Sequence, residues 1–589
     1  MKQFFKFMFA SFAGTLLTLI LILLLFAGMV ASISSMAQKE TVKAKPHTVL
    51  HITWKGPILD RTPENPFENF DFATLKPHRT LGLNDILKDI DKAAKDPHVD
   101  GIFLDMETIP AGMATTEEIY NKLKDFKKTG KFIVSYANNY DQKAYYLASL
   151  SDKIYLNPQG LVLFKGLHAQ IMFLKNLLDK LEIKAQVIRG PNNKYKSAVE
   201  PLLLDKMSKA NRQQMQDLLG NIWGKILTVL HENRGISVDE MNRLADSLSL
   251  FDAQQALKYH FVDGIAYRDM VMDSLKKRVG TKPYYMAFDK YDRVELKKKT
   301  EKISRDRIAV IYALGEINQG ESKDETSIGS VTLAKAIREA RTNKHVKAIV
   351  MRVNSPGGDV LASDVIRREV ELAAKSKPFI VSMGDVAASG GYWISTDANF
   401  IFAQPVTITG SIGVFGIIPD LQKFMNKKLG ITFDKVMTNK NADFVDVMAP
   451  LNPLQKQRLN DGITRVYHQF VSLVAQSRHL NKKYVDSIAR GRVWSGSEAL
   501  KLGLVDSLGG MQDAIAYAAK KAKLKNYRIT EYPKRKAFFE ELMNELSGKA
   551  QARLVDEQLQ AFEPYLSEIK MWSRMKGIQA RLPFVMKIE

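Results

Sequence analysis

The 589-residue sequence contains no cysteine, which excludes disulfide bonds, thiolate metal sites and a cysteine nucleophile. Its 10 histidines show no local arrangement typical of a triad partner. There is no His-Glu-x-x-His motif and no carboxylate cluster with metal-ligand spacing, so neither a metal nor another cofactor is expected. The net charge of +22 comes from scattered basic residues without a zinc-finger or RNA-binding signature. We therefore expect no nucleic-acid partner, and favour a basic surface beside anionic lipid.

Long apolar runs are rare, and one stands out near the N-terminus. No charged residue occurs from Phe7 to Gln38, which exceeds the roughly 20 residues that a spanning helix needs. Lys2 and Lys6 precede the run and favour an inside N-terminus. The alternative is a cleaved signal peptide with a small-x-small site at 35–37. We expect an uncleaved single-pass anchor with the rest of the chain on one side of the membrane.

The chain carries an internal duplication. His98 and His345 begin similar apolar runs 345 − 98 = 247 residues apart, and Phe132 matches Phe379 at the same separation. The spacing is 450 − 201 = 249 further on and 499 − 256 = 243 near the end of each copy. A separation this steady predicts two copies of one domain.

Each copy alternates short apolar runs with helical patterns, which predicts βαβ units on a mostly parallel sheet and an α/β fold. In the second copy, strands are expected at 308–312, 348–353 and 379–383 and helices at 332–340 and 360–375. We expect an anchor over 1–45, a first repeat over 46–300, a second repeat over 301–535 and a helical C-terminal segment over 536–589. The lysine-rich residues 290–306 are expected to connect the two repeats.

A serine set among glycines follows the strand-like run Phe400–Ala403. Gly410 and Gly413 flank Ser411 closely, so the backbone can turn sharply and expose a hydroxyl for attack on a substrate. The pattern by itself is also compatible with an ordinary strand-to-helix turn. The first copy has Phe164 opposite Ser411, so the serine and its glycines are present only in the second copy.

Two further glycine loops follow predicted strands of the second copy. Gly357 and Gly358 are expected at the start of a helix, where backbone N–H groups can stabilise an oxyanion. Ser389 precedes another glycine pair that opens a helix. Ligands of such sheets bind at the carboxyl ends of the strands, where these loops fall.

A serine nucleophile needs a base, and a buried lysine can serve if burial lowers its pKa. The repeat comparison singles out Lys196, because Val445 stands opposite it in the second copy. The lysine thus lies in one half of the chain and the serine in the other, so neither half alone could perform the reaction.

At these residues the chain resembles the signal peptide peptidase A (protease IV) family in its long, membrane-anchored bacterial form. The resemblance extends from the anchor to about residue 535 and is specific in the combination of four motifs: 195–201, 354–358, 388–392 and 409–413.

The resemblance implies a Clp-protease/crotonase-like fold, Ser411 as nucleophile and Lys196 as general base. It places the loop of Gly357 and Gly358 by the oxyanion hole. It also implies a homotetramer of the bacterial inner membrane whose body faces the periplasm and degrades cleaved signal peptides.

The mechanism that we expect is a serine–lysine endopeptidase in which Lys196 activates Ser411. Backbone N–H groups near Gly357, Gly358 and Ile412 would hold the oxyanion. Ser389 is the rival nucleophile, because the related Clp protease subunit carries its serine in that loop. Two other functions stay open at this point: a crotonase-type acyl-CoA enzyme and a non-catalytic scaffold of the same fold.

Overall fold

A long N-terminal helix precedes the body of the protein. The computed structural model describes residues 2–37, 42–54, 56–63, 70–71, 76–77, 80–190, 192–296, 304–534 and 578–582. Helix α1 (Lys2–Ala37) contains the window Gln3–Ile22, which among the described residues is long and apolar enough to cross a membrane. The side chains of this window that are described are not buried against the body. This arrangement fits the expected anchor.

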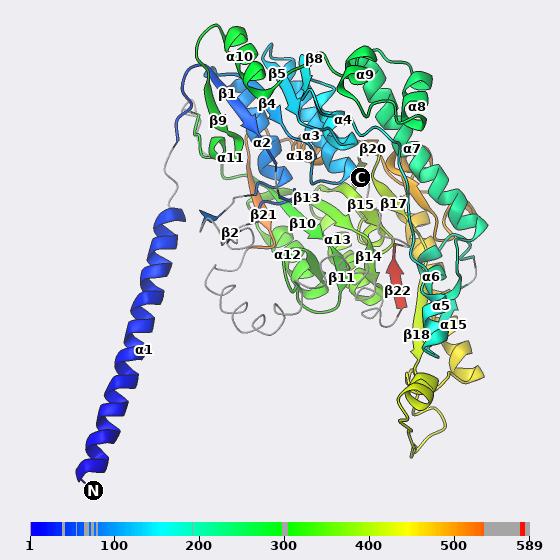
Figure 1. Cartoon of the computed structure of the whole chain (residues 1–589). Helices are drawn as coiled ribbons and strands as arrows, with labels where there is room; N and C mark the ends of the chain where they lie inside the picture. Colours follow the sequence, from blue (N-terminus) through cyan, green and yellow to red (C-terminus); the bar gives the residue numbers. More distant parts are fainter. Residues whose placement is uncertain are drawn as a thin grey trace.

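Two similar parallel sheets form the body (Figure 1). The first has the order β8 (Gly264–Ile265), β6 (Lys153–Leu156), β5 (Phe132–Ala137), β4 (Val99–Asp105), β1 (Thr48–Ile52), β9 (Tyr284–Ala287). The second repeats this order with β20 (Ser507–Leu508), β16 (Phe400–Ala403), β15 (Phe379–Ala388), β13 (Val346–Ser355), β10 (Arg307–Leu314), β21 (Arg528–Tyr532). Strand β17 (Ile408–Gly410) also pairs with β15, and β19 (Val493–Ser495) pairs with β17 in the antiparallel direction. The expected α/β architecture in two tandem copies is confirmed.

The helices repeat with the spacing seen in the sequence. Strands β4 and β13 begin 346 − 99 = 247 residues apart, as do α3 and α13, since 360 − 113 = 247. The matching pairs are α2 (Leu83–Lys95) with α12 (Ser330–Thr342), α3 (Met113–Lys127) with α13 (Val360–Ala374), α4 (Gln142–Ala148) with α14 (Gly390–Trp393), α7 (Lys209–Arg234) with α15 (Pro453–Ser477), α8 (Val238–Asp246) with α16 (Lys482–Ile488), α9 (Ala253–Lys258) with α17 (Gly496–Lys501), and α10 (Arg268–Val279) with α18 (Met511–Lys521). The strands and helices expected in the second copy all form.

A third sheet joins the two copies and was not expected. Its order is β12 (Ser327–Gly329), β11 (Glu316–Asn318), β14 (Gly357–Asp359), β22 (Ile578–Arg581), β18 (Phe415–Asp420), β7 (Lys184–Arg189). Strand β7 comes from the first copy and pairs antiparallel with β18 of the second, from Arg189 opposite Phe415 to Lys184 opposite Asp420. Because β7 pairs with β18, the first-copy residues that come after β7 in the sequence lie beside the second copy.

Two expectations are corrected here. Gly357 and Gly358 lie in strand β14 and not in a helix; helix α13 begins only at Val360, and the Asp359 side chain caps it by accepting from the Ala362 amide. The segment expected to be helical after residue 535 is described only over 578–582, where it forms β22. The remainder of that segment, and residues 297–303 of the expected connection between the copies, lie outside the described residues.

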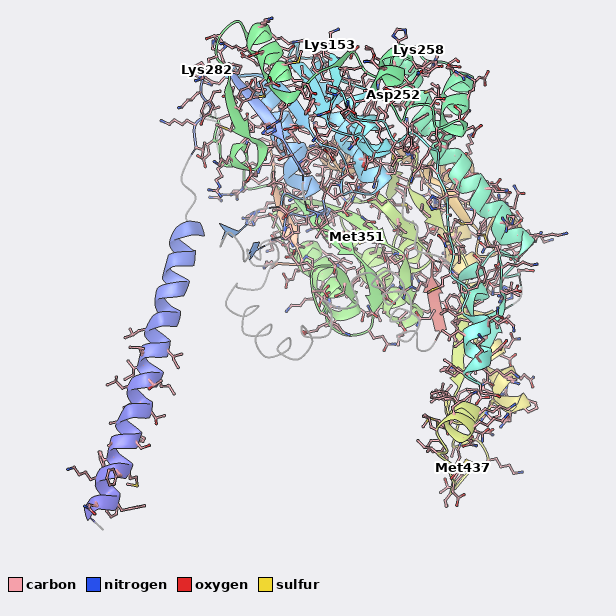
Figure 2. All side chains as sticks on the ribbon, in the orientation of Figure 1. Lys153, Asp252, Lys258, Lys282, Met351 and Met437 are labelled. Atoms are coloured by element: carbon pink, nitrogen blue, oxygen red, sulfur yellow. The ribbon has the colours of Figure 1, made fainter. Side chains whose placement is uncertain are left out.

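The second copy contributes both a buried sheet and a projecting segment. Figure 2 shows Met351 of β13 inside the body and Met437 at the tip of a segment that projects from it. Met351 is fully buried, and Met437 is 44% exposed. One face of the second sheet packs with α18 against the first copy, and α12 and α13 cover the other face.

A buried arginine ties the copies together. Arg352 of β13 is inaccessible to solvent and pairs with two first-copy carboxylates, Asp60 and Glu118, each at 2.6 Å. Replacing it by methionine leaves both carboxylates buried without their counter-charge. We expect Arg352→Met to lower the free energy of unfolding by about 3–5 kcal/mol in chemical denaturation.

The matched control is Arg368→Met, which removes a 57% exposed arginine that pairs with Glu371. Because solvent screens that pair, we expect a change below about 1 kcal/mol. Equal effects of the two substitutions would contradict the interpretation that the buried arginine couples the copies.

Candidate active site

The candidate site forms where three neighbouring strands end. Strands β13, β15 and β17 run parallel, with Ser355 opposite Ala387 and Ala388 opposite Gly410. The residues that follow these strands are therefore brought to one edge of the sheet. They include the glycines of β14, Ser389 and Ser411, as expected for ligands at carboxyl ends of strands.

Ser411 adopts an uncommon backbone conformation. Its φ is +50°, and Gly410 before it has φ +76°. Non-glycine residues avoid this left-handed region, so contacts with the surroundings have to hold the conformation. One such contact is the hydrogen bond that the Ser411 amide donates to the Arg492 carbonyl oxygen at 2.7 Å. The positive φ values of Gly410 and Ser411 make a sharp turn at the end of β17, and Ser411 is fully buried there, not exposed as the sequence predicted. This is the sharp turn that the flanking glycines predicted.

Lys196 reaches this turn from the first copy. Its loop follows β7, which is paired with β18, and β18 begins four residues after Ser411. The Lys196 Nζ lies 2.9 Å from the Ser411 Oγ, 3.0 Å from the Ser411 carbonyl oxygen and 2.8 Å from the Ser389 Oγ. The structure thus brings together within one chain the two residues that the repeat comparison separated by 411 − 196 = 215 positions.

The surroundings of Lys196 favour its neutral form. The side chain is 1% exposed, and no carboxylate in the described part of the chain forms an ion pair with it. Burial lowers the pKa of the Lys196 ammonium well below its ordinary value, because the charged form loses its hydration and gains no counter-charge. A lysine in its neutral form has a lone pair that can accept a proton.

Ser389 lies as close to the lysine as Ser411 does. It follows β15 with φ +55°, and its amide donates to the Gly410 carbonyl at 2.8 Å. Its Oγ also approaches the Gly413 carbonyl oxygen at 3.5 Å, a long contact in which the hydroxyl donates. The distances to the lysine therefore do not distinguish the two serines.

The residues expected to donate to the oxyanion already have hydrogen-bond or strand-pairing partners within the protein. The Gly357 amide donates to the Ser355 Oγ at 3.2 Å. Gly358 is paired on both sides, with Ile317 of β11 and Ala580 of β22. Ile412 is buried beside Ser411, and its carbonyl accepts from the Gly491 amide at 2.9 Å. Gly357 and Gly358 thus lie in strand β14, with Gly357 beside Gly390, and Ile412 directly follows Ser411.

Residues that sequence reasoning missed fix the lysine. Gly491 has φ +77°, and a Cβ added there would lie 2.5 Å from the Lys196 Cβ, so only glycine leaves room for this loop. The Tyr195 amide donates to the Arg490 carbonyl at 2.9 Å. Gln214 of α7 donates to the Tyr195 carbonyl at 3.1 Å and to the Ser197 Oγ at 3.0 Å. No local sequence signal marks these contacts, because they join residues that are up to 300 positions apart.

The corresponding positions of the other copy hold side chains without acid–base chemistry, Phe164 and Val445. Phe164, opposite Ser411, is 2% exposed and its ring lies 5.0 Å from that of Trp223. Val445, opposite Lys196, lies in the projecting segment and is 48% exposed. The complementary loss read from the sequence therefore corresponds to one complete lysine–serine pair in the described residues.

Comparison with known proteins now identifies the family. The model of peptidase family S49 matches residues 125–282 and again 371–525. Protease 4 from Salmonella typhi is 39% identical over 494 residues, covering 82% of this chain and 78% of the relative. The chloroplastic serine protease SPPA of Arabidopsis thaliana is 34% identical over 461 residues, covering 76% and 67%. A putative signal peptide peptidase SppA from Enterococcus faecium is 34% identical over 228 residues, covering 38% and 64%.

These matches define a serine protease, and the chain belongs to peptidase family S49. The double match agrees with the two copies seen in the fold. Among solved structures, ClpP1 from Listeria monocytogenes is 19% identical and covers 35% of this chain and 92% of its own, with a TM-score of 0.23. Family membership favours peptide hydrolysis over the acyl-CoA alternative.

Proposed function

We propose that the protein is a serine endopeptidase in which Ser411 is the nucleophile and Lys196 the general base. The observation that carries this proposal is the 2.9 Å contact between the Lys196 Nζ and the Ser411 Oγ in a buried setting. Neutral Lys196 takes the hydroxyl proton as the Ser411 oxygen attacks a peptide carbonyl. The lysine then gives that proton to the leaving amine, and water releases the acyl group by the same route.

Hydrogen-bond directions support Ser411 over Ser389 as the nucleophile. A neutral lysine has two N–H donors and one lone pair. The Ser411 carbonyl can only accept, and the Ser389 Oγ can accept as well while its own proton is directed to the Gly413 carbonyl oxygen 3.5 Å away. Both N–H groups are thereby used, and the lone pair is left for the Ser411 hydroxyl. Ser389 is then a positioning residue that orients the amine.

The oxyanion is held by backbone N–H groups of the loops around Ser411, with Gly357, Gly358 and Ile412 as the donors. Only glycine fits at residue 357, because a Cβ there would lie 2.6 Å from the Gly390 nitrogen beside Ser389. Substrate would displace the existing contact of the Gly357 amide with Ser355.

Cleaved signal peptides are the substrate class that we propose. Helix α1 supplies an apolar span beside which an enzyme body would meet peptides left in a membrane. Lys2 and Lys6 before the span favour an inside N-terminus, which puts the body on the periplasmic side of a bacterial inner membrane. The putative signal peptide peptidase from Enterococcus faecium is related over 38% of the chain. A homotetramer is part of the same proposal.

Active-site labelling tests the nucleophile. We expect a fluorophosphonate to modify the detergent-solubilised protein at residue 411, as mapped by mass spectrometry of proteolytic fragments. Ser389→Ala should still be labelled at Ser411, whereas Ser411→Ala should not be labelled. Labelling at residue 389 would contradict the assignment. Turnover of acyl-CoA thioesters without labelling would instead support the crotonase-type alternative.

A further inference from the structure

Helix α7 carries a buried glutamine that contacts the lysine loop on both sides of the lysine. Gln214 is 1% exposed, and its Nε2 donates to the Tyr195 carbonyl oxygen at 3.1 Å and to the Ser197 Oγ at 3.0 Å. Tyr195 and Ser197 directly precede and follow Lys196 in the chain. The Gln214 amide group therefore restrains the backbone from which the lysine side chain extends.

The carbonyl end of the same side chain reaches the second copy. The Val493 amide of β19 donates to the Gln214 Oε1 in a long hydrogen bond of 3.4 Å. Val493 is opposite Gly410 of β17, and Ser411 follows Gly410 directly. One side chain thus links the lysine loop of the first copy to the strand pair that leads into the serine turn of the second.

A second buried amide makes a similar link beyond the serine. Asn193 is 8% exposed, and its Nδ2 donates to the Val414 carbonyl oxygen at 3.0 Å. Its own backbone carbonyl accepts from the Lys196 amide at 3.2 Å. Val414 lies three residues after Ser411. The serine turn is therefore connected to the lysine loop before the serine, through Gln214, and after it, through Asn193.

The charged side chains that lie on the same elements bond to other partners. Glu200, which follows the lysine loop, accepts from the Ser208 Oγ at 2.6 Å and from the Asn211 Nδ2 at 3.1 Å. Asp217 of α7 pairs with Arg492 of the second copy at 2.6 Å. The two side chains that join the lysine loop to the serine turn are thus the uncharged ones.

The neutrality of both amides suits a lysine that has to act as a base. A carboxylate in either place would favour the ammonium form, whereas an amide has no charge at any pH. Burial lowers the pKa of Lys196, so a lysine displaced toward water would regain a pKa closer to its ordinary value of 10.5. The position and the basicity of Lys196 therefore depend on the same contacts.

We propose that Gln214 and Asn193 are positioning residues that hold Lys196 of the first copy at hydrogen-bond distance from Ser411 of the second. This inference rests on the proposed function, since it concerns the base of the same reaction. Gln214 has almost no exposed surface with which to contact a substrate. Its loss therefore acts on kcat and not on KM.

The test is Gln214→Met in the detergent-solubilised full chain. Methionine has a similar length but neither the N–H donors nor the carbonyl acceptor of the glutamine. We expect kcat for a quenched peptide to fall about 10²-fold, as for a displacement of about 1 Å, with KM within about twofold of the wild type. The rise of kcat/KM with pH should move to higher pH, because a better hydrated lysine loses its proton only there.

Gln216→Met is the matched control, because Gln216 is an exposed residue of the same helix. We expect its activity to stay within about twofold of the wild type and its pH profile to be unchanged. Asn193→Ala is a second variant that removes the link to Val414, and its kcat and pH profile should change in the same direction as those of Gln214→Met. It also carries the test if Gln214→Met does not fold.

The pH profile distinguishes a displaced lysine from a loss of folded protein. A smaller folded fraction lowers the apparent kcat but leaves the pH midpoint where it is in the wild type. A lower kcat with an unchanged midpoint in the folded variants would therefore overturn the inference, as would kinetics equal to those of the wild type.

A structure of detergent-solubilised Gln214→Met separates this inference from the proposed function. We expect the distance between the Lys196 Nζ and the Ser411 Oγ to increase from 2.9 Å to beyond about 3.5 Å, the outer limit of a hydrogen bond. If the distance increases while Lys196→Met retains full peptidase activity, the positioning role stands and the proposed catalysis fails. If the distance is unchanged while Lys196→Met is inactive, the positioning role fails alone.

Discussion

Replacement of Lys196 by methionine is expected to lower kcat/KM for peptide hydrolysis by about 10³–10⁴-fold, the upper part of what a positioned general base contributes. Methionine keeps much of the side-chain volume in a position that is 1% exposed, but it has no lone pair of sufficient basicity to take the Ser411 proton. The measurement is steady-state cleavage of a quenched peptide by detergent-solubilised protein.

The pH dependence gives the same prediction a second readout. The proposed mechanism needs neutral Lys196, so in the wild-type protein kcat/KM should rise with pH through the lowered pKa of this lysine and level off above it. A lysine at its ordinary pKa of 10.5 would still be gaining activity at pH 10. The residual activity of Lys196→Met should lack this rise.

Lys194→Met is the matched control for both readouts. Lys194 lies two residues away on the same loop, is exposed, and contacts the Tyr195 ring with its ammonium 5.4 Å from the centroid. We expect activity within about twofold of the wild type, because exposed substitutions away from a site have small effects. Full activity of Lys196→Met, or a flat wild-type profile, would remove the lysine from the mechanism.

Gly491→Ala is expected to lower kcat/KM by about 10²-fold, the size of loss that a displacement of about 1 Å produces in a catalytic group. The added methyl would lie 2.5 Å from the Lys196 Cβ and 2.7 Å from its backbone nitrogen and Cα, so the lysine loop has to move. Retention of the protein's melting temperature within a few degrees, alongside lost activity, would locate the effect in the site.

The control substitution must also place an alanine at a positive φ, but without a contact to the Lys196 loop. Gly235 ends α7 with φ +70°, and no atom lies within 4 Å of a Cβ added there. Gly235→Ala therefore costs about 1–2 kcal/mol of left-handed strain and should leave kcat/KM unchanged. If both alanines reduce activity equally, the loss comes from general destabilisation and not from the position of Lys196.

The local patterns of the sequence determine much of this fold. Strands such as Phe379–Ala388 and helices such as Val360–Ala374 follow from the periodicity of apolar residues. The duplication with its complementary losses pointed to Lys196 and to the two loops of Ser389 and Ser411, and the family resemblance chose Ser411. Which residue performs which role in catalysis stays a prediction, as do the domain boundaries.

The features that could not be predicted from the sequence depend on strand pairing and contacts between residues far apart in the chain. The third sheet joins β7, β14, β18 and β22, which lie in four distant parts of the chain. Ile578–Arg581 had been expected to be helical, but its conformation is set by the edges of β14 and β18 and not by its own residues. The space that Gly491 leaves for Lys196 is likewise visible only when residues 295 positions apart are in contact, since 491 − 196 = 295.

The pairing of β7 with β18 has a consequence for a chain that is still on the ribosome. When the first three hundred residues have emerged, they carry the amine but no hydroxyl for it to activate. Even after Ser411 has emerged, the loop that holds the lysine waits for the Arg490 carbonyl and Gly491, and the turn that holds Ser411 waits for the Arg492 carbonyl. The proposed lysine–serine pair is therefore held in place only after residue 492 has been synthesised, so a shorter nascent chain lacks the contacts that position the pair.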